Sequence, residues 1–181
     1  MNLEEEKKLV EEAKKNSQAF SILYEEYYSR IFGYILKRVS DVELAQDITS
    51  ETFVKALEKI WSFKWKGISF SSWIYRIASN EIVNFYRKKK IIVSLEKISE
   101  PKSVSNPLEE VVRAQEEIEK KKEFLSLHKK ISQLPVKYQE VIYLRFFEKK
   151  KIEEIAEILG KKEGTIKTHL HRGLERLRKL F

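Results

Sequence analysis

The sequence has no cysteine and contains only three prolines, five glycines and three histidines. Without cysteine the chain forms neither disulfides nor thiolate metal sites, which suits a reducing cytoplasm. Because glycine and proline are scarce and helix-forming residues dominate, we expect an all-α fold. No apolar run approaches the length of a membrane span, and the charged N-terminal residues do not resemble a secretory signal. These absences predict a cytoplasmic protein with no membrane insertion.

The charge of the 181 residues is unevenly distributed around a formal net value of +8. Residues 1–60 have a balance of −3, whereas residues 61–90 hold seven Lys and Arg against Glu81 alone. The remaining residues contribute +5. Two separate basic zones favour a polyanion bound at two places, although a solvated Lys-rich surface would have the same charge.

The last thirty or so residues predict two helices joined by a turn at Gly160, which supplies the positive φ that ends the first helix. Apolar side chains at Ile152, Ile155, Ile158 and Leu159 form the buried stripe of the first helix. Helical spacing predicts that the second helix buries Ile166, Leu170, Gly173, Leu174 and Leu177. The same spacing turns outward Gly164, Thr165, Thr168, His171, Arg172 and Glu175. This arrangement matches a helix-turn-helix, whose second helix enters the DNA major groove.

The rest of the chain predicts further helices in two groups. Ser40 and Glu43 are spaced as a capping box, so a helix should begin there. That helix is expected to run through Leu44, Ile48, Phe53, Val54, Leu57 and Trp61. Residues 91–112 are rich in Ser and contain Pro101 and Pro107, which is typical of a tether. We therefore expect two small helical domains, residues 1–90 and 113–181, joined by a flexible linker at residues 91–112.

All three tryptophans lie within residues 61–75, around a loop that contains Lys64, Lys66 and Gly67. Rings interleaved with cations suit single-stranded nucleic acid, because bases stack on the rings while the cations follow the phosphates. Burial in the core is the stronger interpretation for Phe53, Phe70 and Trp73. For Trp65, between two lysines, both interpretations stay open.

The next helix carries a polar stripe opposite its apolar residues. Arg76, Asn80, Asn84 and Arg87 are three or four positions apart, and Lys88 follows them. Asn pairs with base edges and Arg with phosphates, although a solvated helix face would look similar.

No catalytic or cofactor site is expected. The histidines His128, His169 and His171 lack partners at useful spacing, and two of them point about 200° apart on one helix. Asp47 and Glu51 are better explained as a solvated acidic face than as a Mg²⁺ site. We expect a protein that is not an enzyme.

Two long stretches resemble one family. The segments FSILYEEYYSRIFGYILKRVSDVELAQDITSETFVKALEKIW and SFSSWIYRIASNEIVNFYRKKK look like the N-terminal domain of bacterial RNA polymerase sigma factors of the extracytoplasmic-function (ECF) group. The segment LPVKYQEVIYLRFFEKKKIEEIAEILGKKEGTIKTHLHRGLERLRK resembles their second domain. Together they cover nearly all of the chain outside the linker.

The resemblance implies a sigma factor that binds core RNA polymerase and directs promoter-specific initiation of transcription. It implies minus-thirty-five duplex contacts by Lys162, Thr165, Lys167, Thr168, His171, Arg172 and Arg176. It implies capture of a flipped minus-ten base, and contacts around it, by Phe63, Trp65, Lys66, Arg76, Asn80, Asn84, Arg87 and Lys88. It implies docking on core polymerase by Asp47, Ser50, Glu51, Thr52 and Phe53. It also implies an anti-sigma partner that sequesters both domains.

Two other functions stay open from the residues alone. One is a helix-turn-helix regulator that acts without polymerase, and the other is a helical interaction protein that binds no DNA. The aromatic loop argues against the first, because a reader of duplex DNA has no need to trap single-stranded bases.

Overall fold

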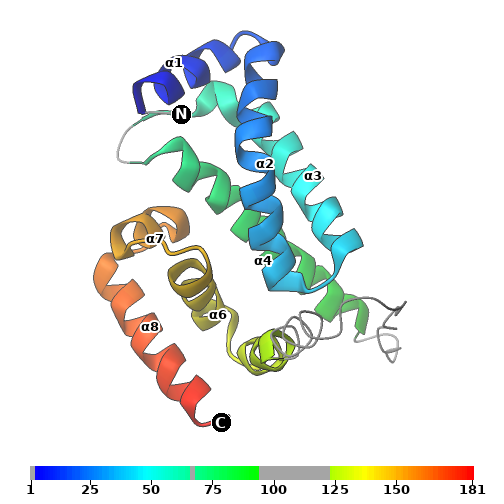
Figure 1. Ribbon diagram of the computed structural model, residues 1–181, viewed down its shortest axis with the longest axis vertical. Coiled ribbons are helices and arrows are strands. Elements are labelled where there is room, and N and C mark those ends of the chain that lie inside the picture. Colours follow the sequence, from blue (N-terminus) through cyan, green and yellow to red (C-terminus); the bar gives the residue numbers. More distant parts are fainter. Residues whose placement is uncertain (1–2, 66–67, 94–122) are drawn as a thin grey trace, which may run out of the picture.

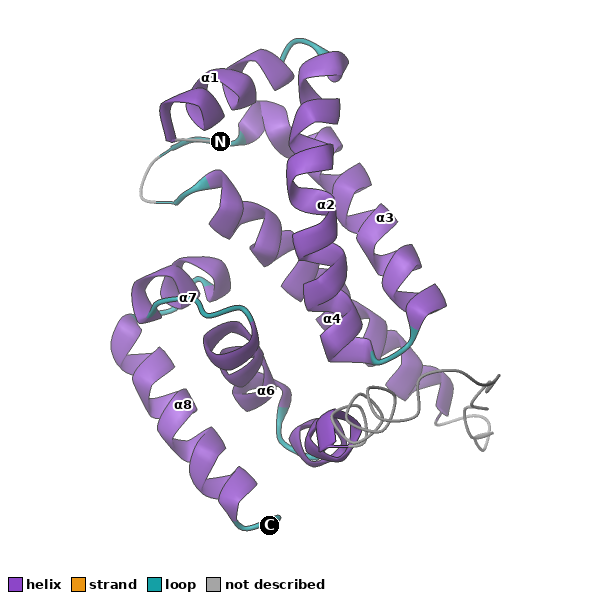
Figure 2. Ribbon diagram, in the orientation of Figure 1, coloured by secondary structure: helices purple, strands orange, loops and turns teal. Residues whose placement is uncertain are grey.

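The computed structural model describes residues 3–65, 68–93 and 123–181. Every regular element in these ranges is a helix, which confirms the all-α prediction (Figures 1 and 2). Residues 94–112 of the predicted linker lie outside the described residues, as does Lys66.

The N-terminal half is a bundle built around one long central helix. Its elements are α1 (Leu3–Ala13), α2 (Ser17–Val39), α3 (Val42–Lys59), the 3₁₀ turn η1 (Ile60–Ser62) and α4 (Phe70–Val93). Helix α2 packs against α1, α3 and α4 (Figure 1). Helix α4 ends at Val93, beyond the end expected at Lys90.

The start of α3 differs from the predicted capping box. Ser40 ends α2 in the left-handed conformation, with φ of 54°, so it is not available to begin the next helix. Asp41 takes the extended N-cap conformation instead, and its carboxylate accepts a hydrogen bond from the Leu44 amide at 2.9 Å. An N-cap bond of this kind contributes about 1 kcal/mol, and a carboxylate also suits the positive end of the helix dipole.

The face that α3 buries is also not the predicted one. Val54, Leu57 and Trp61 were expected in the apolar stripe, but all three are exposed, Trp61 by 73%. The core side of α3 carries the larger Ile48 and Phe53 and, between them, small or hydroxyl-bearing residues. These are Ala45, Thr49, Thr52 and Ala56. The hydroxyls of Thr49 and Thr52 are satisfied within the helix by the carbonyls of Ala45 and Ile48, so their burial leaves no unpaired polar group.

The C-terminal half holds the predicted helix-turn-helix. A helix at residues 123–132 leads to α6 (Val136–Ile142), the π-helical turn η2 (Tyr143–Phe147), α7 (Ile152–Leu159) and α8 (Glu163–Arg178). Gly160 ends α7 with φ of 61°, as expected. Ile155, Ile158, Ile166 and Leu177 are buried, whereas Leu174, which helical spacing places in the buried stripe, is exposed.

The two halves dock directly on each other. Helix α4 packs against α7, and α2 packs against η2, so α6, α7 and α8 lie below the N-terminal bundle in Figure 1. Buried apolar side chains of both halves belong to one contiguous cluster. The described part of the chain is therefore a closed two-unit structure.

The tight crossing of α8 over α6 depends on Gly173. A Cβ added there would lie 3.1 Å from Cβ of Tyr138 and 3.3 Å from Cδ1 of Ile142. At Gly164, on the same helix, an added Cβ meets nothing within 4 Å.

We predict that Gly173→Ala lowers the free energy of unfolding by about 1–3 kcal/mol, because overpacking outweighs the better helix propensity of alanine. The matched control Gly164→Ala should leave stability unchanged or raise it by up to about 1 kcal/mol. Urea unfolding followed by circular dichroism measures both variants. Wild-type stability in Gly173→Ala would show that α6 moves aside without cost.

Candidate nucleic-acid interface

The outer face of α8 is a continuous polar surface. All seven residues predicted to contact duplex DNA are exposed there or at the start of the helix: Lys162, Thr165, Lys167, Thr168, His171, Arg172 and Arg176. Their arrangement follows from the burial of Ile166, Gly173 and Leu177 on the opposite side. All seven side chains are thus presented to solvent, and four of them, Thr165, Thr168, His171 and Arg172, are those that the helical spacing turns outward.

Several of these side chains have only weak partners. Lys167 pairs with Glu163 and His171 with Glu175, each at 3.5 Å and each highly exposed. Such i,i+4 pairs contribute a few tenths of a kcal/mol. Only Arg176 lies over a ring, with its guanidinium 5.4 Å from the centre of Tyr138, so the surface is free to exchange its partners for phosphates or bases.

His169 lies beside this surface but turns inward. Its ring packs edge-on against Tyr138 at 5.7 Å. Burial lowers the pKa of His169, and the nearby Lys137, Lys161 and Arg172 lower it further. The neutral form of His169 is therefore favoured.

The aromatic residues after α3 form one ring cluster at the edge of the N-terminal bundle. Phe63, only 3% exposed, contacts Trp65 and Trp73 with ring centres 5.2 Å apart, and it also packs on Phe70. Trp65 is half-buried, and its indole N–H is buried without a partner among the described residues. Phe63 thus supports Trp65 from beneath and is not itself a surface group.

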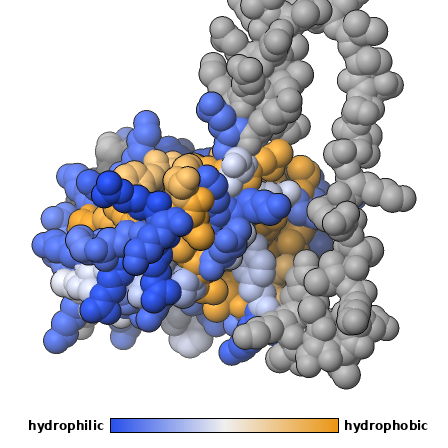
Figure 3. All heavy atoms as spheres, turned by 90° about the horizontal axis from the view of Figure 1, so that it is seen from below, coloured by the Kyte–Doolittle hydropathy of each residue, from blue (hydrophilic) through white to orange (hydrophobic). Residues whose placement is uncertain are grey.

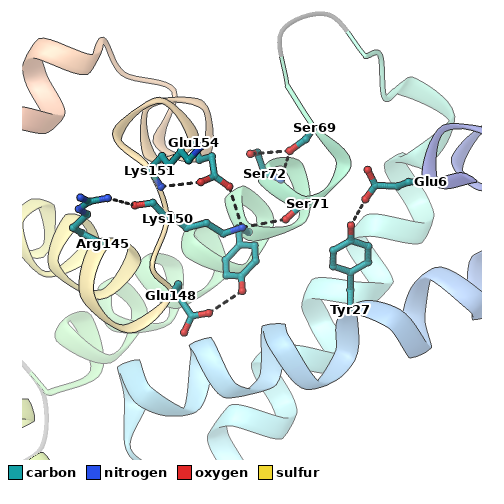
Figure 4. Close-up of polar contacts among 11 residues, drawn as sticks. Glu6, Tyr27, Ser69, Ser71, Ser72, Arg145, Glu148, Lys150, Lys151 and Glu154 are labelled. Carbon is teal, nitrogen blue, oxygen red and sulfur yellow. Dashed lines mark hydrogen bonds and ion pairs between the residues drawn. The ribbon is translucent and has the colours of Figure 1, made fainter. Parts of the chain in front are cut away.

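A buried hydrogen bond between α1 and α2 supports this cluster from behind. The hydroxyl of Tyr27 donates to the carboxylate of Glu6 (Figure 4), and the Tyr27 ring packs edge-on against Phe70 at 5.4 Å. Burial, with the carboxylate of Glu6, raises the pKa of Tyr27. No motif in the sequence signals this pair, because its members are 21 residues apart.

The polar stripe of α4 is formed as predicted, but its first residue is engaged. Asn80 and Arg87 are exposed, and Arg87 donates to Asn84 at 3.2 Å. Arg76, by contrast, is half-buried and donates to the backbone carbonyls of Glu157 and Ile158 at the end of α7. The side chain of Lys88 lies outside the described residues.

The acidic face of α3 includes three of the five residues predicted to dock on polymerase. Asp47, Ser50 and Glu51 are exposed, whereas Thr52 is fully buried and Phe53 is 4% exposed. The last two belong to the core, where Phe53 packs against Tyr24 and Tyr28, so neither is available for direct contact. The exposed Val54, Leu57 and Trp61 continue the acidic face at helical spacing.

The polar surfaces are interrupted by apolar side chains in the C-terminal half. Seen from below, the molecule is largely hydrophilic, with apolar residues between the charged ones (Figure 3). Leu125, Leu174 and Phe181 are among the exposed apolar residues of this half. Among the described residues no cluster of three or more metal ligands occurs, and none of their helices is long and apolar enough to cross a bilayer.

Comparison with known proteins assigns both units. Sigma-70 region 2 matches residues 23–91 and sigma-70 region 4 matches residues 124–177. The chain is 33% identical over 178 residues to the ECF RNA polymerase sigma factor SigW of Bacillus subtilis (strain 168), across 96% of this chain and 95% of that protein. The chain belongs to the ECF sigma factors. The sigma factor YlaC of the same organism is 30% identical over 165 residues, across 91% of this chain and 93% of that protein.

Solved structures agree on the fold of this sigma factor. The structure of CnrH in complex with the cytosolic domain of CnrY matches with a TM-score of 0.69 at 19% identity, across 97% of this chain and 96% of that chain. The sigma factor RpoE in complex with the anti-sigma factor NepR from Bartonella quintana matches with a TM-score of 0.62 at 22% identity, across 89% of this chain and 95% of that chain. We use region 2 for the unit of α2, α3 and α4, and region 4 for the unit from residue 123 onward.

Proposed function

We propose that this ECF sigma factor binds core RNA polymerase in the cytoplasm and directs it to promoters through two DNA contacts. The proposal rests on the presence, in one chain, of an exposed polar helix of a helix-turn-helix and a separate ring cluster that follows α3, with Lys64 and Lys66 on either side of Trp65 in the sequence. A protein that only reads duplex DNA needs the first of these surfaces. Promoter opening needs both.

Region 4 supplies the minus-thirty-five contact. Helix α8 would enter the major groove with Lys167, Thr168, His171 and Arg172 toward base edges, and with Lys162, Thr165 and Arg176 toward the backbone. A good bidentate contact between a side chain and a base discriminates by about 1–3 kcal/mol. Their exposure supports this role, since the groups are already presented to solvent in the free chain.

Region 2 supplies the minus-ten contact. Trp65 and Lys66 would capture a flipped base, with Phe63 as the buried support, while Asn80, Asn84, Arg87 and Lys88 contact the strand beside it. The indole N–H of Trp65, which is buried without a partner among the described residues, supports this role, because such a donor costs about 1–3 kcal/mol and outward movement of the ring would relieve it. Arg76 joins this surface only when it leaves α7.

Core polymerase would dock on the face of α3 that carries Asp47, Ser50 and Glu51. The net charge of −3 over residues 1–60 suits a basic partner surface. The neighbouring Val54, Leu57 and Trp61 add exposed apolar area, which is the usual centre of a protein interface. An anti-sigma factor that covers region 2 and region 4 would keep the sigma factor from polymerase.

Reconstitution tests the proposal as a whole. We predict that the chain copurifies with core RNA polymerase and that the complex starts transcription at discrete sites from a library of randomised promoters. The selected promoters should share two sequence elements separated by a spacer, because two surfaces read them. Specific duplex binding by the chain alone, with no polymerase binding, would instead establish a polymerase-independent regulator.

We predict that Arg172→Ala lowers affinity for a selected promoter about tenfold to a hundredfold, from the loss of one base contact of about 1–3 kcal/mol. Selectivity at one minus-thirty-five position should relax with it. Arg178→Ala removes the same charge from the same helix outside the predicted contacts, and it should leave selectivity intact. Filter binding by the holoenzyme measures the affinity and selectivity of both variants. Equal effects of the two substitutions would show that Arg172 contributes only its positive charge and no base contact.

We predict that Trp65→Ala leaves the initial promoter complex in place and impairs strand opening. Stacking on one base contributes about 1–3 kcal/mol, so the open complex should decrease by roughly five- to a hundredfold. Permanganate reactivity of minus-ten thymines measures the open fraction. Trp65→Phe, which keeps a ring, should restore part of it, and full reactivity in Trp65→Ala would exclude the proposed capture.

A further inference from the structure

Arg76 connects region 2 to the end of a region 4 helix. Its guanidinium donates to the carbonyls of Glu157 and Ile158, the latter at 3.2 Å from Nε. The last carbonyls of a helix lack partners inside the helix and carry the negative end of its dipole, so a cation is well placed there. The guanidinium lies beside Gly160, where an added Cβ would be 4.0 Å from Arg76 Nη2.

Glu148 is a second connection between the same two units. It lies between η2 and α7, and its side chain is only 9% exposed. One carboxylate oxygen accepts from Lys37 of α2 at 2.9 Å and the other from the hydroxyl of Tyr75 of α4 at 2.8 Å. Burial and this carboxylate raise the pKa of Tyr75. Lys150 adds a contact at 3.4 Å to Ser71 of α4, beside the Glu148 contact in Figure 4.

Arg38 opposes the docked arrangement. Its side chain is 2% exposed, and its Nε and Nη2 atoms have no hydrogen-bond partner among the described residues. It lies 5.2 Å from the ring centre of Tyr143 in region 4, and it donates to the hydroxyl of Tyr34 at 3.3 Å. The charge of Glu140, a half-buried carboxyl, acts on Arg38, but the two do not form an ion pair among the described residues. A buried charge without a counter-ion in direct contact is costly, and separating the units would return Arg38 to water.

We propose that docking of region 4 on region 2 is an autoinhibitory latch in which Arg76 is withheld from DNA. The same guanidinium serves α7 in the closed chain and the minus-ten region of the promoter in the open one, and it cannot serve both at once. Glu148 holds the latch, and Arg38 keeps it weak enough for core polymerase to release. The promoter role of Arg76 rests on the proposed function; the closure of the free chain does not.

The closure is tested on the free full-length chain by distance measurement. Because the sequence has no cysteine, Ser29→Cys on α2 and Lys179→Cys after α8, both exposed in the structure, take spin labels at two known places. Double electron–electron resonance should give one narrow distance distribution for the latched chain. Adding Glu148→Ala should broaden it toward longer distances, whereas Glu153→Ala, an exposed position on α7, should not. A broad distribution without any substitution, or no change in Glu148→Ala, would overturn the latch.

The inhibition is tested by transcription with limiting sigma factor. If the latch leaves about a tenth of the chains open, Glu148→Ala should lower the half-saturating concentration by up to about tenfold, because apparent affinity scales with the competent fraction. The maximal rate should stay unchanged, and a half-saturating concentration equal to that of Glu153→Ala would overturn the inhibition. Absence of polymerase binding by every variant would remove the proposed function, while the distances still report whether the free chain is closed.

Discussion

The docking of region 4 on region 2 depends on whether the cations at their junction are paired, hydrogen-bonded or left without a partner. A charge removed from water needs hydrogen bonds or a counter-ion, and four cations near the junction of the two regions meet this need in different ways. Lys37 finds the carboxylate of Glu148, Arg76 finds the carbonyl end of α7, and Lys150 reaches Ser71. Arg38 contacts a hydroxyl and the face of a ring, and the carboxyl of Glu140 acts on it without forming an ion pair. The junction is therefore specific in its contacts and limited in its stability.

Gly160 links the local structure of region 4 to this junction. Its left-handed backbone ends α7, which turns the chain toward α8 and leaves the carbonyls of Glu157 and Ile158 at an accessible helix end. The turn that defines the DNA-reading motif thus also forms the acceptor for Arg76. Only Lys161 and Lys162 separate Gly160 from α8, so the acceptor of Arg76 and the start of the predicted recognition helix are adjacent in the chain.

Much of region 4 was predictable because its pattern is local. The stripe of Ile152, Ile155 and Ile158, followed by Gly160, specifies helix, turn and burial within a few residues. In region 2 the same reasoning placed the buried face of α3 wrongly. Val54, Leu57 and Trp61 are apolar but exposed, while Thr49 and Thr52 are buried and bonded to their own helix. The apolar residue types predicted that one face of α3 is buried, but the small residues that pack against α2 and α4 lie on a different face, and that face is the buried one.

The contacts between the regions were beyond prediction from the sequence for a different reason. Arg76 and Glu157 are 81 residues apart, and no sequence motif contains both of them. The polar stripe of α4 predicted correctly that Arg76 would lie on the same face as Asn80. Helical spacing does not, however, predict which acceptors in region 4 the Arg76 side chain binds. Likewise, Ser40 and Glu43 have the spacing of a capping box, and only the end of α2 at Ser40 shows why Asp41 caps α3 instead.

The recognition helix itself is not simply basic, and this bears on selectivity. Glu163 and Glu175 lie on its exposed face and pair with Lys167 and His171. In the free chain these exposed pairs contribute little to stability. Near DNA, however, both carboxylates repel phosphates, so non-specific attraction is smaller than the cations alone would produce. If region 4 reads DNA as proposed, binding would then depend more on correct base contacts by residues such as Arg172, and the proposed second contact, by region 2, would add more to the stability of the promoter complex. A latch that withholds part of region 2 would therefore act on a contact that region 4 does not replace in the proposed function.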